Sequence, residues 1–173
     1  MAAFEVLVTR HQGRVRSFLV RLSKEQATAD DLAQETFLRA WSKLETFRGG
    51  SFPAWILKMA YRLFLNHTRR QSRYRSLLSE FAAEPQSNQT AQASNDSSSR
   101  QTALENGWTD LPKLLGVLSP EQRAVFVLSY AQGFSHAEIG HILNLPLGTV
   151  KSHLQRGKKV IQQRFGLTQE DST

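Results

Sequence analysis

Cationic and aromatic side chains recur at steps of three and four residues between positions 53 and 70, the spacing of one face of a helix. This set comprises Trp55, Lys58, Arg62, Asn66 and Arg69. From Arg62 to Arg75 the chain has five arginines and no acidic residue. Guanidinium groups bind phosphates and an indole ring stacks on an unpaired base, so the pattern is typical of a surface that binds a single nucleic-acid strand. The alternative is that Trp55 only completes a core.

The segment just before this helix, residues 45–52, is a loop with two glycines and two aromatic residues. Gly49 and Gly50 allow a ligand to approach the backbone closely, and Phe47 and Phe52 add further rings beside Trp55. The loop could therefore contribute to the same strand-binding surface. The alternative, as for Trp55, is that Phe52 belongs to the core.

A second helical stretch, residues 30–44, has the opposite chemistry. Acidic and amide side chains surround one outward leucine, Leu38, and this outward stripe comprises Asp31, Gln34, Glu35, Leu38 and Ser42. Carboxylates repel phosphates, so the stripe favours a protein partner rather than DNA. Single surface leucines are also common without any function, and that alternative stays open.

The last third of the chain has the boundary residues of short helices. Residues 119–122 (SPEQ) and 135–138 (SHAE) are two capping boxes, and Gly133 follows the first of the helices that they start. Asn144 stands where a tight turn needs a left-handed backbone, and Gly140 stands where a second helix must cross closely. A further helix from about residue 146 to Phe165 completes a predicted helix-turn-helix.

The outward face of that last helix is polar and basic. It comprises Gly148, Ser152, Gln155 and Lys159, flanked by Thr149, Lys151 and Arg156, while Val150 and Leu154 point inward. Side chains of these types reach base edges and phosphates in a major groove. The pattern therefore predicts duplex DNA binding, with a small bundle that has a solvated basic face as the alternative.

The remaining periodicity predicts an all-α fold of two small helical domains joined by a flexible linker. Apolar residues at helical spacing predict helices over residues 4–22, 30–44 (with Trp41 on the apolar side) and 53–70, and a short fourth turn at 74–81. We expect these elements to form a three-helix bundle over residues 1–78. Residues 84–106 are rich in Ser, Asn, Gln and Thr, so we expect residues 79–110 to be a linker and 111–173 a second domain.

Charge and composition narrow the function classes. The 22 Lys and Arg residues outnumber the 15 Asp and Glu residues, and the excess lies in the two domains, since the linker is acidic. This balance favours nucleic acid as a partner. The chain has no cysteine, and we expect no secretion signal and no membrane insertion. The five histidines lack i, i+4 pairing and there is no phosphate-binding loop, so we expect no metal, no cofactor, no catalytic residue and no enzyme activity.

Several motifs in one order resemble a known family. Residues 31–41 (DLAQETFLRAW), 47–55 (FRGGSFPAW) and 60–66 (AYRLFLN) resemble region 2 of bacterial sigma factors. Residues 118–126 (LSPEQRAVF), 135–140 (SHAEIG) and 148–152 (GTVKS) resemble region 4. A chain with only these two regions resembles the small extracytoplasmic-function (ECF) class of the sigma-70 family.

The resemblance implies a role for each surface. It implies that the acidic stripe binds the clamp helices of the β′ subunit of core RNA polymerase, through Asp31, Gln34, Glu35, Leu38 and Arg39. It implies that the melted −10 strand is bound by Phe47, Arg48, Ser51, Phe52, Trp55, Lys58, Arg62, Asn66, Arg69 and Arg70. It implies that the −35 duplex is read by Ser135, Thr149, Lys151, Ser152, His153, Gln155, Arg156 and Lys159.

The same resemblance implies further partners. The second domain would rest on the β flap of the polymerase, and an anti-sigma factor would hold the protein inactive. The protein would act in the cytoplasm, with the polymerase on the nucleoid, or be held at the inner membrane by its inhibitor. The chain departs from the family pattern at Asn144, His153, Gln155 and Gly157. Gly157 should weaken its helix by about 0.5–1 kcal/mol relative to Ala, and Gln155 could favour adenine.

One rival from the same broad class is a free-standing two-domain response regulator, whose terminal helix-turn-helix also carries a Gly-Thr-Val-Lys run. Such a protein needs a receiver or ligand-binding domain in front. The first 78 residues lack the alternation of strands and helices that a receiver would show, and they carry a basic face of their own.

Overall fold

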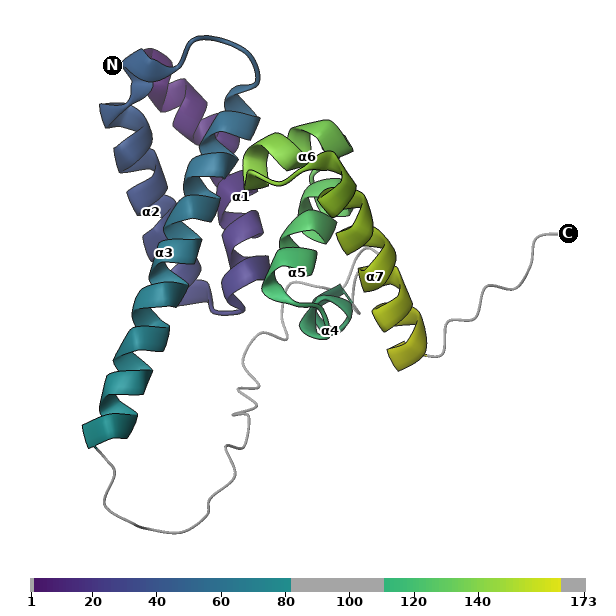
Figure 1. Cartoon of the computed structure of the whole chain (residues 1–173). Helices are drawn as coiled ribbons and strands as arrows, with labels where there is room; N and C mark the ends of the chain where they lie inside the picture. Colours follow the sequence, from purple (N-terminus) through teal and green to yellow (C-terminus); the bar gives the residue numbers. More distant parts are fainter. Residues whose placement is uncertain (1, 82–110, 166–173) are drawn as a thin grey trace, which may run out of the picture.

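The computed structural model describes residues 2–81 and 111–165, and within these ranges every regular element is helical. The first range holds α1 (Ala2–Ser23), α2 (Gln26–Ser42), the short 3-10 helix η1 (Leu44–Thr46) and α3 (Phe52–Phe81). The second holds α4 (Leu111–Gly116), α5 (Pro120–Phe126), the π-helical turn η2 (Val127–Ala131), α6 (His136–Leu143) and α7 (Leu147–Phe165). The all-α prediction with two helical domains is confirmed (Figure 1). The predicted linker beyond Phe81 lies outside the described residues.

The first domain is a bundle in which α1, α2 and α3 all contact one another. Its centre is fully buried and consists of Phe18 and Leu19 from α1 with Ile56 and Leu57 from α3. With the other buried residues of these helices, such as Val15 and Leu22 in α1 and Ala60 in α3, they recur at three- and four-residue steps, which is why each helix turns one apolar stripe inward. Truncating a ring such as Phe18 to alanine would cost about 3–5 kcal/mol.

Two helix boundaries in this domain differ from the sequence prediction. Helix α3 does not end at Arg70 but continues without a break to Phe81, so the predicted separate turn at 74–81 is its last part. Neither proline nor glycine occurs between Ala54 and Phe81, so nothing in the chain stops the helix. Helix α2 begins at Gln26 and ends at Ser42, four residues earlier at its start than predicted.

The second domain follows its boundary residues closely. Ser119 and Ser135 each form a complete capping box, with Gln122 and Glu138 respectively. Asn144 ends α6 in the left-handed conformation (φ 57°), as predicted. A Cβ at Gly140 would lie 2.8 Å from the carbonyl oxygen of Leu145, so the turn requires glycine there. The helix-turn-helix is confirmed in α6 and α7.

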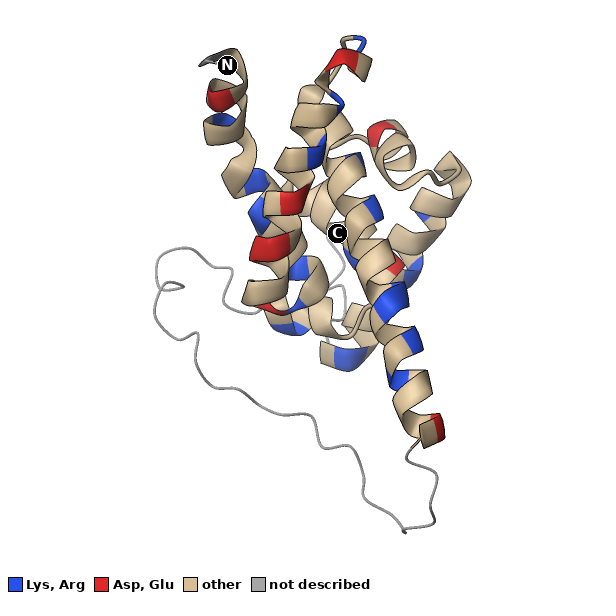
Figure 2. Ribbon diagram, turned by 90° about the vertical axis from the view of Figure 1, so that its left-hand side faces the viewer, with Lys and Arg blue, Asp and Glu red and all other residues tan. Residues whose placement is uncertain are grey.

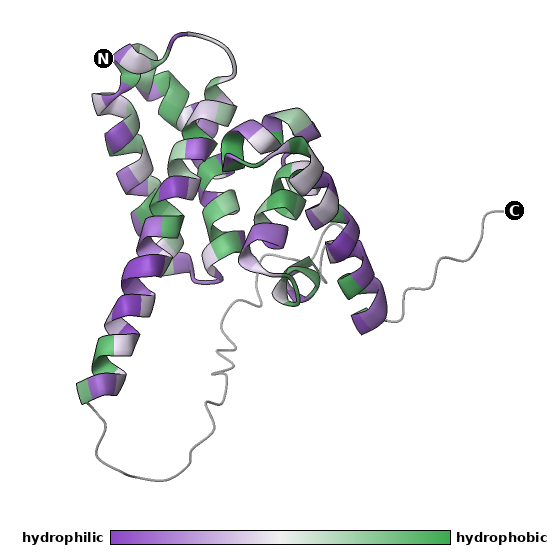
Figure 3. Ribbon diagram, in the orientation of Figure 1, coloured by the Kyte–Doolittle hydropathy of each residue, from purple (hydrophilic) through white to green (hydrophobic). Residues whose placement is uncertain are grey.

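The two domains contact each other along one seam. Helix α6 packs against α3, and α5 packs against α1 (Figure 1). Across the seam the guanidinium of Arg123 donates a hydrogen bond to the carbonyl of Leu22 (3.1 Å). Green, apolar segments meet inside both domains and reappear at the free end of α3 (Figure 3).

Candidate nucleic-acid interfaces and docking surface

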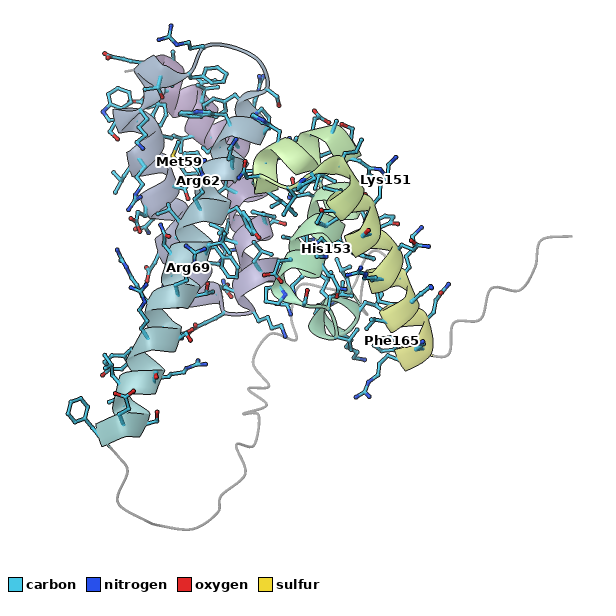
Figure 4. The ribbon with its side chains drawn as sticks, in the orientation of Figure 1. Met59, Arg62, Arg69, Lys151, His153 and Phe165 are labelled. Carbon is cyan, nitrogen blue, oxygen red and sulfur yellow. The ribbon has the colours of Figure 1, made fainter. Side chains whose placement is uncertain are left out.

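The predicted strand-binding face lies on the exposed side of α3. Arg62, Asn66, Arg69 and Arg70 are exposed, while Lys58 and Trp55 are half-buried. The opposite face of α3 packs into the core, and its buried residues include Ile56, Leu57, Ala60, Tyr61, Leu63 and Phe64. Met59, Arg62 and Arg69 follow one another down α3 in Figure 4. The helix therefore presents a row of cations to solvent along about two and a half turns.

An aromatic cluster stands at the upper end of this row. The ring centroids of Phe47 and Trp55 lie 5.3 Å apart, and those of Phe52 and Trp55 lie 5.5 Å apart. Phe52 is only 8% exposed, so it belongs to the core, as the alternative interpretation of the sequence predicted. It therefore supports Trp55 rather than facing a ligand.

The loop that leads into α3 is shaped by its glycines. Gly49 and Gly50 both have φ near +90°, a backbone that residues with a side chain rarely adopt. Arg48 is exposed beside them, and the hydroxyl of Ser51 accepts a hydrogen bond from the backbone N–H of Ala54 (3.3 Å), which caps α3. Ser51 thus fixes the start of the helix that carries the cations.

The acidic stripe lies on the outer side of α2. Leu38 is 71% exposed, and Asp31 and Gln34 are exposed on the same helix. The guanidinium of Arg39 donates a hydrogen bond to the carboxylate of Glu35, four residues earlier. The stripe therefore combines one protruding apolar side chain with carboxylates at its margins.

Next to Leu38 the surface is hollowed by aromatic residues. A shallow depression of about 370 Å³ is lined by Phe4, Gln34, Phe37, Leu38 and Trp41. The prediction that Trp41 belongs to the apolar core side is wrong, because its ring is 47% exposed and packs on Phe4 with centroids 5.0 Å apart. The core ends at Ala40, and Trp41 extends the docking surface beside Leu38.

The predicted duplex-reading face lies on α7. Lys151, Gln155, Arg156 and Lys159 are exposed, Thr149 and Ser152 are half-buried, and Val150 and Leu154 are buried on the opposite side. In Figure 4 Lys151 lies on the outer side of α7, and His153 lies on the side toward the first domain. The buried Nδ1 of His153 has no hydrogen-bond partner within the described residues. His153 is thus less open to DNA than its neighbours, and the exposed Ser135 is engaged in its capping box.

Two residues of the second domain, Arg123 and Gly157, have roles that the sequence did not predict. Arg123 is 6% exposed and donates to three carbonyls, those of Leu115, Leu118 and Leu22. Burial lowers its pKa. Leu115 and Leu118 precede Arg123 in the same domain, whereas Leu22 lies at the end of α1, so only the apposition of both domains completes the set. No local sequence signal predicts this contact.

Gly157 is the second such residue. A Cβ at this position would lie 2.4 Å from Cε2 of Phe126, so α7 can approach α5 only if residue 157 has no side chain. Its departure from the family pattern is therefore a packing requirement. The sequence interpretation, a simple weakening of the helix, is incomplete.

No cluster of His, Cys, Asp and Glu among the described residues could hold a metal ion. No helix in the described ranges has the length and apolar character needed to cross a membrane.

The fold and these surfaces are those of a transcription factor with two helical regions. Comparison with known proteins identifies the family to which each region belongs. The profile of sigma-70 region 2 matches residues 7–74, and that of sigma-70 region 4 matches residues 109–161. The chain belongs to the sigma-70 family. Within it, the relatives place the chain among the ECF RNA polymerase sigma factors.

Three relatives illustrate this. SigW of Bacillus subtilis is 30% identical over 167 residues, which cover 94% of this chain and 89% of SigW. CarQ of Myxococcus xanthus is 32% identical over 168 residues, with 95% and 90% coverage. SigE of Mycolicibacterium smegmatis is 33% identical over 162 residues, and the match spans 94% of this chain but only 61% of SigE.

Among solved structures, the sigma factor RpoE of Bartonella quintana, in complex with the anti-sigma factor NepR, matches with a TM-score of 0.74 and 26% identity. The match covers 96% of this chain and 99% of the other. CnrH, in complex with the cytosolic domain of CnrY, has the same fold (TM-score 0.65, 22% identity). Because region 2 matches the first domain, the free-standing response regulator is not favoured.

Proposed function

We propose that this ECF sigma factor binds core RNA polymerase through α2, captures the melted −10 strand with α3, and reads the −35 duplex with α7. The observation that carries the proposal is the separation of three chemically distinct surfaces on one chain. The surface of α2 is acidic around an exposed leucine, that of α3 is rich in arginine beside an aromatic cluster, and that of α7 is basic with amides and hydroxyls.

Docking on the polymerase would use the protruding Leu38 as an anchor. Burying a 71% exposed leucine in a partner's apolar pocket contributes to affinity, and Asp31 and Glu35 at the margin select a basic partner. Trp41 and Phe37 enlarge the apolar contact. The β′ clamp helices are the partner that the family resemblance implies for this surface.

Opening of the promoter would use α3. Arg62, Arg69 and Arg70 follow the phosphates of one strand, and Asn66 offers an amide to a base edge. Trp55, supported by Phe47 and Phe52, offers a ring on which an unpaired base stacks. Phe52 contributes by fixing Trp55, since its own ring is buried.

Recognition of the duplex would use α7. Gln155 lies on the exposed face and can accept from and donate to an adenine edge. Lys151, Arg156 and Lys159 surround it and neutralise phosphates. Catalysis of RNA synthesis would remain with the polymerase, so the protein itself would not be an enzyme and would act in the cytoplasm.

An anti-sigma factor is the regulatory partner that we propose. The similarity to RpoE, a sigma factor crystallised with its inhibitor NepR, supports this. The β flap of the polymerase is the partner that we propose for the second domain as a whole.

Run-off transcription with purified core polymerase on a genomic promoter library tests the proposal. We expect the wild-type protein to give core polymerase start-site selectivity. The double variant Asp31→Arg with Leu38→Asp should reduce transcripts and core binding about a hundredfold or more, because it reverses a charge and removes the apolar anchor. The matched control Glu25→Arg with Val6→Asp, an exposed acid and an exposed apolar residue of the same domain, should retain activity. Unchanged transcription from the first variant, or tight binding of duplex promoters without polymerase, would contradict the proposal.

A further inference from the structure

The free end of α3 carries a row of exposed apolar side chains that neither DNA binding nor polymerase docking uses. Tyr74 is 64% exposed, Leu77 52%, Leu78 50% and Phe81 88%. Their spacing of i, i+3, i+4 and i+7 places them on one side of the helix. We call these four residues the apolar stripe.

The apolar stripe continues the core-facing side of α3. At about 100° per residue, positions 56, 63, 74 and 81 fall within about 20° of one line along the helix. Ile56 and Leu63 are buried against the bundle, whereas every residue from Arg69 to Phe81 is exposed. Helices α1 and α2 therefore cover only the first part of this side, and α3 projects beyond them (Figure 1).

This projection creates a step at the end of the bundle. The apolar stripe lies on the side of α3 on which α1 and α2 pack, and those helices stand about 10 Å above that side. A flat surface such as a bilayer would meet α1 and α2 before it reached the apolar stripe. A single helix has the thickness of the step and fits into it as an extra member of the bundle.

The charges beside the apolar stripe are positive. Arg70 lies at its start and Arg73 and Arg75 lie on its two sides, and Glu80 is the one acid between residues 62 and 81. Figure 2 shows blue patches along this exposed part of α3. Two copies of the chain would bring these arginines together and repel each other, whereas a helix with carboxylates beside its apolar face would be attracted.

We propose that the apolar stripe is a docking site for an amphipathic helix of a protein partner, with acidic residues on both sides of the partner's apolar face. The exposed length, residues 69–81, accommodates about four turns of such a helix, roughly 20 Å. Arg62 and Arg69 of the strand-binding face lie about a third of a turn away around α3, whereas Arg70 lies at the start of the apolar stripe. A DNA strand that contacts Arg62 and Arg69 and a partner helix that lies beyond Arg70 can therefore occupy α3 together.

The test uses the full chain and two stapled helical peptides of sixteen residues. Both peptides carry leucine at i, i+3, i+4 and i+7, and the residues beside the leucines are glutamate in one and lysine in the other. We expect fluorescence anisotropy to show binding of the glutamate peptide at least tenfold tighter than that of the lysine peptide at low salt. The preference should shrink at 0.5 M salt, because the arginines are exposed.

Two double variants identify the surface. Leu77→Ser with Phe81→Ser should weaken the glutamate peptide at least tenfold, while the control Val6→Ser, also an exposed apolar residue, should not. Arg73→Glu with Arg75→Glu should invert the preference toward the lysine peptide. All these positions are exposed, so circular dichroism and melting temperature should match wild type.

Four outcomes would overturn the proposal. The first is equal binding of the two peptides by the wild-type protein, and the second is undiminished binding of the glutamate peptide by the Leu77/Phe81 variant. The third is recruitment of the wild-type protein, but not of this variant, to phosphatidylglycerol vesicles. The fourth is a concentration-dependent dimer that the wild-type protein forms and this variant does not. The vesicle result would assign the apolar stripe to a membrane, and the dimer result to a second copy. Neither depends on polymerase or promoter, so failure here leaves the proposed transcription function intact.

Discussion

Helices α3 and α7 are both basic on their exposed sides, yet they differ in what accompanies the charge. On α3 the cations are mainly arginines and stand beside a cluster of three aromatic rings. On α7 they are mainly lysines interleaved with Gln155, Ser152 and Thr149, and no aromatic ring lies among these residues. Charge attracts either form of DNA, but rings bind unstacked bases and amides bind the edges of paired ones. The residues between the cations therefore determine whether a helix is suited to a single strand or to a duplex.

The largest effect that separates the two helices should come from the strand-binding face of α3. We expect Arg62→Ala with Asn66→Ala to slow promoter opening about a hundredfold, since two contacts at about 1–2 kcal/mol each are lost. Permanganate footprinting of the melted region measures the rate of promoter opening. Both residues are exposed, so the fold should be unaffected.

Binding of the same variant to core polymerase should change less than twofold. If core affinity fell instead while opening was normal, α3 would be a polymerase contact and the contrast between the two helices would be lost. Lys113→Ala, which removes an exposed cation of α4, is the charge control.

The next largest effect is on the stability of the fold, and it should differ between two glycines, one in each domain. Gly157→Ala should destabilise the protein by about 1–3 kcal/mol, because the added Cβ overlaps Phe126. Gly13 lies within α1, and a Cβ there meets nothing within 4 Å. Gly13→Ala should therefore stabilise by about 0.5–1 kcal/mol. Urea unfolding gives both values, and a stabilised Gly157→Ala would mean that α5 and α7 are further apart.

This pair shows what local sequence can and cannot predict. Helix propensity treats both glycines alike, and the sequence interpretation of Gly157 considered only its effect on the helix. The requirement for glycine comes from Phe126, thirty-one residues earlier, and depends on how closely two helices pack. The capping boxes of Ser119 and Ser135 were predictable, because each is complete within four residues.

The same distinction between local sequence signals and contacts with distant residues explains the other differences between prediction and structure. Helix α3 was predicted too short because no large apolar residue occurs between Leu65 and Tyr74, which interrupts the helical periodicity, although no residue there stops a helix. Trp41 was assigned to the core because it continues the four-residue steps of Ala33 and Phe37, but the buried core of α2 ends at Ala40, one residue before it. Arg123 could not be foreseen, since its partners are carbonyls from both domains.

A smaller effect should come from the duplex-reading face. Gln155→Ala should weaken binding of holoenzyme to a −35 promoter about tenfold, as expected when a side chain with two hydrogen bonds to a base is removed. The loss should be confined to one base pair of the −35 element. Lys159→Ala, by contrast, should weaken all promoters alike and reduce the salt dependence. Competition assays with single-base promoter variants separate the two outcomes, and a uniform loss for Gln155→Ala would make it a phosphate contact.

The smallest effect contrasts the two capping boxes of the second domain, one closed by Gln122 and the other by Glu138. Hydrogen bonds from the backbone N–H and the hydroxyl of Ser135 lower the pKa of Glu138. A carboxylate whose pKa is lower in the folded state stabilises the fold at neutral pH, and this contribution is lost as the pH falls through that lowered pKa. Glu138→Gln should therefore reduce the free energy of unfolding at pH 7, and the difference from wild type should vanish in acid. Gln122→Glu should introduce the same acid sensitivity at α5, where an uncharged glutamine closes the capping box. Urea titrations from pH 3 to pH 7 measure both differences, and a pH-independent Glu138→Gln difference would mean that the charge of Glu138 contributes nothing to its cap.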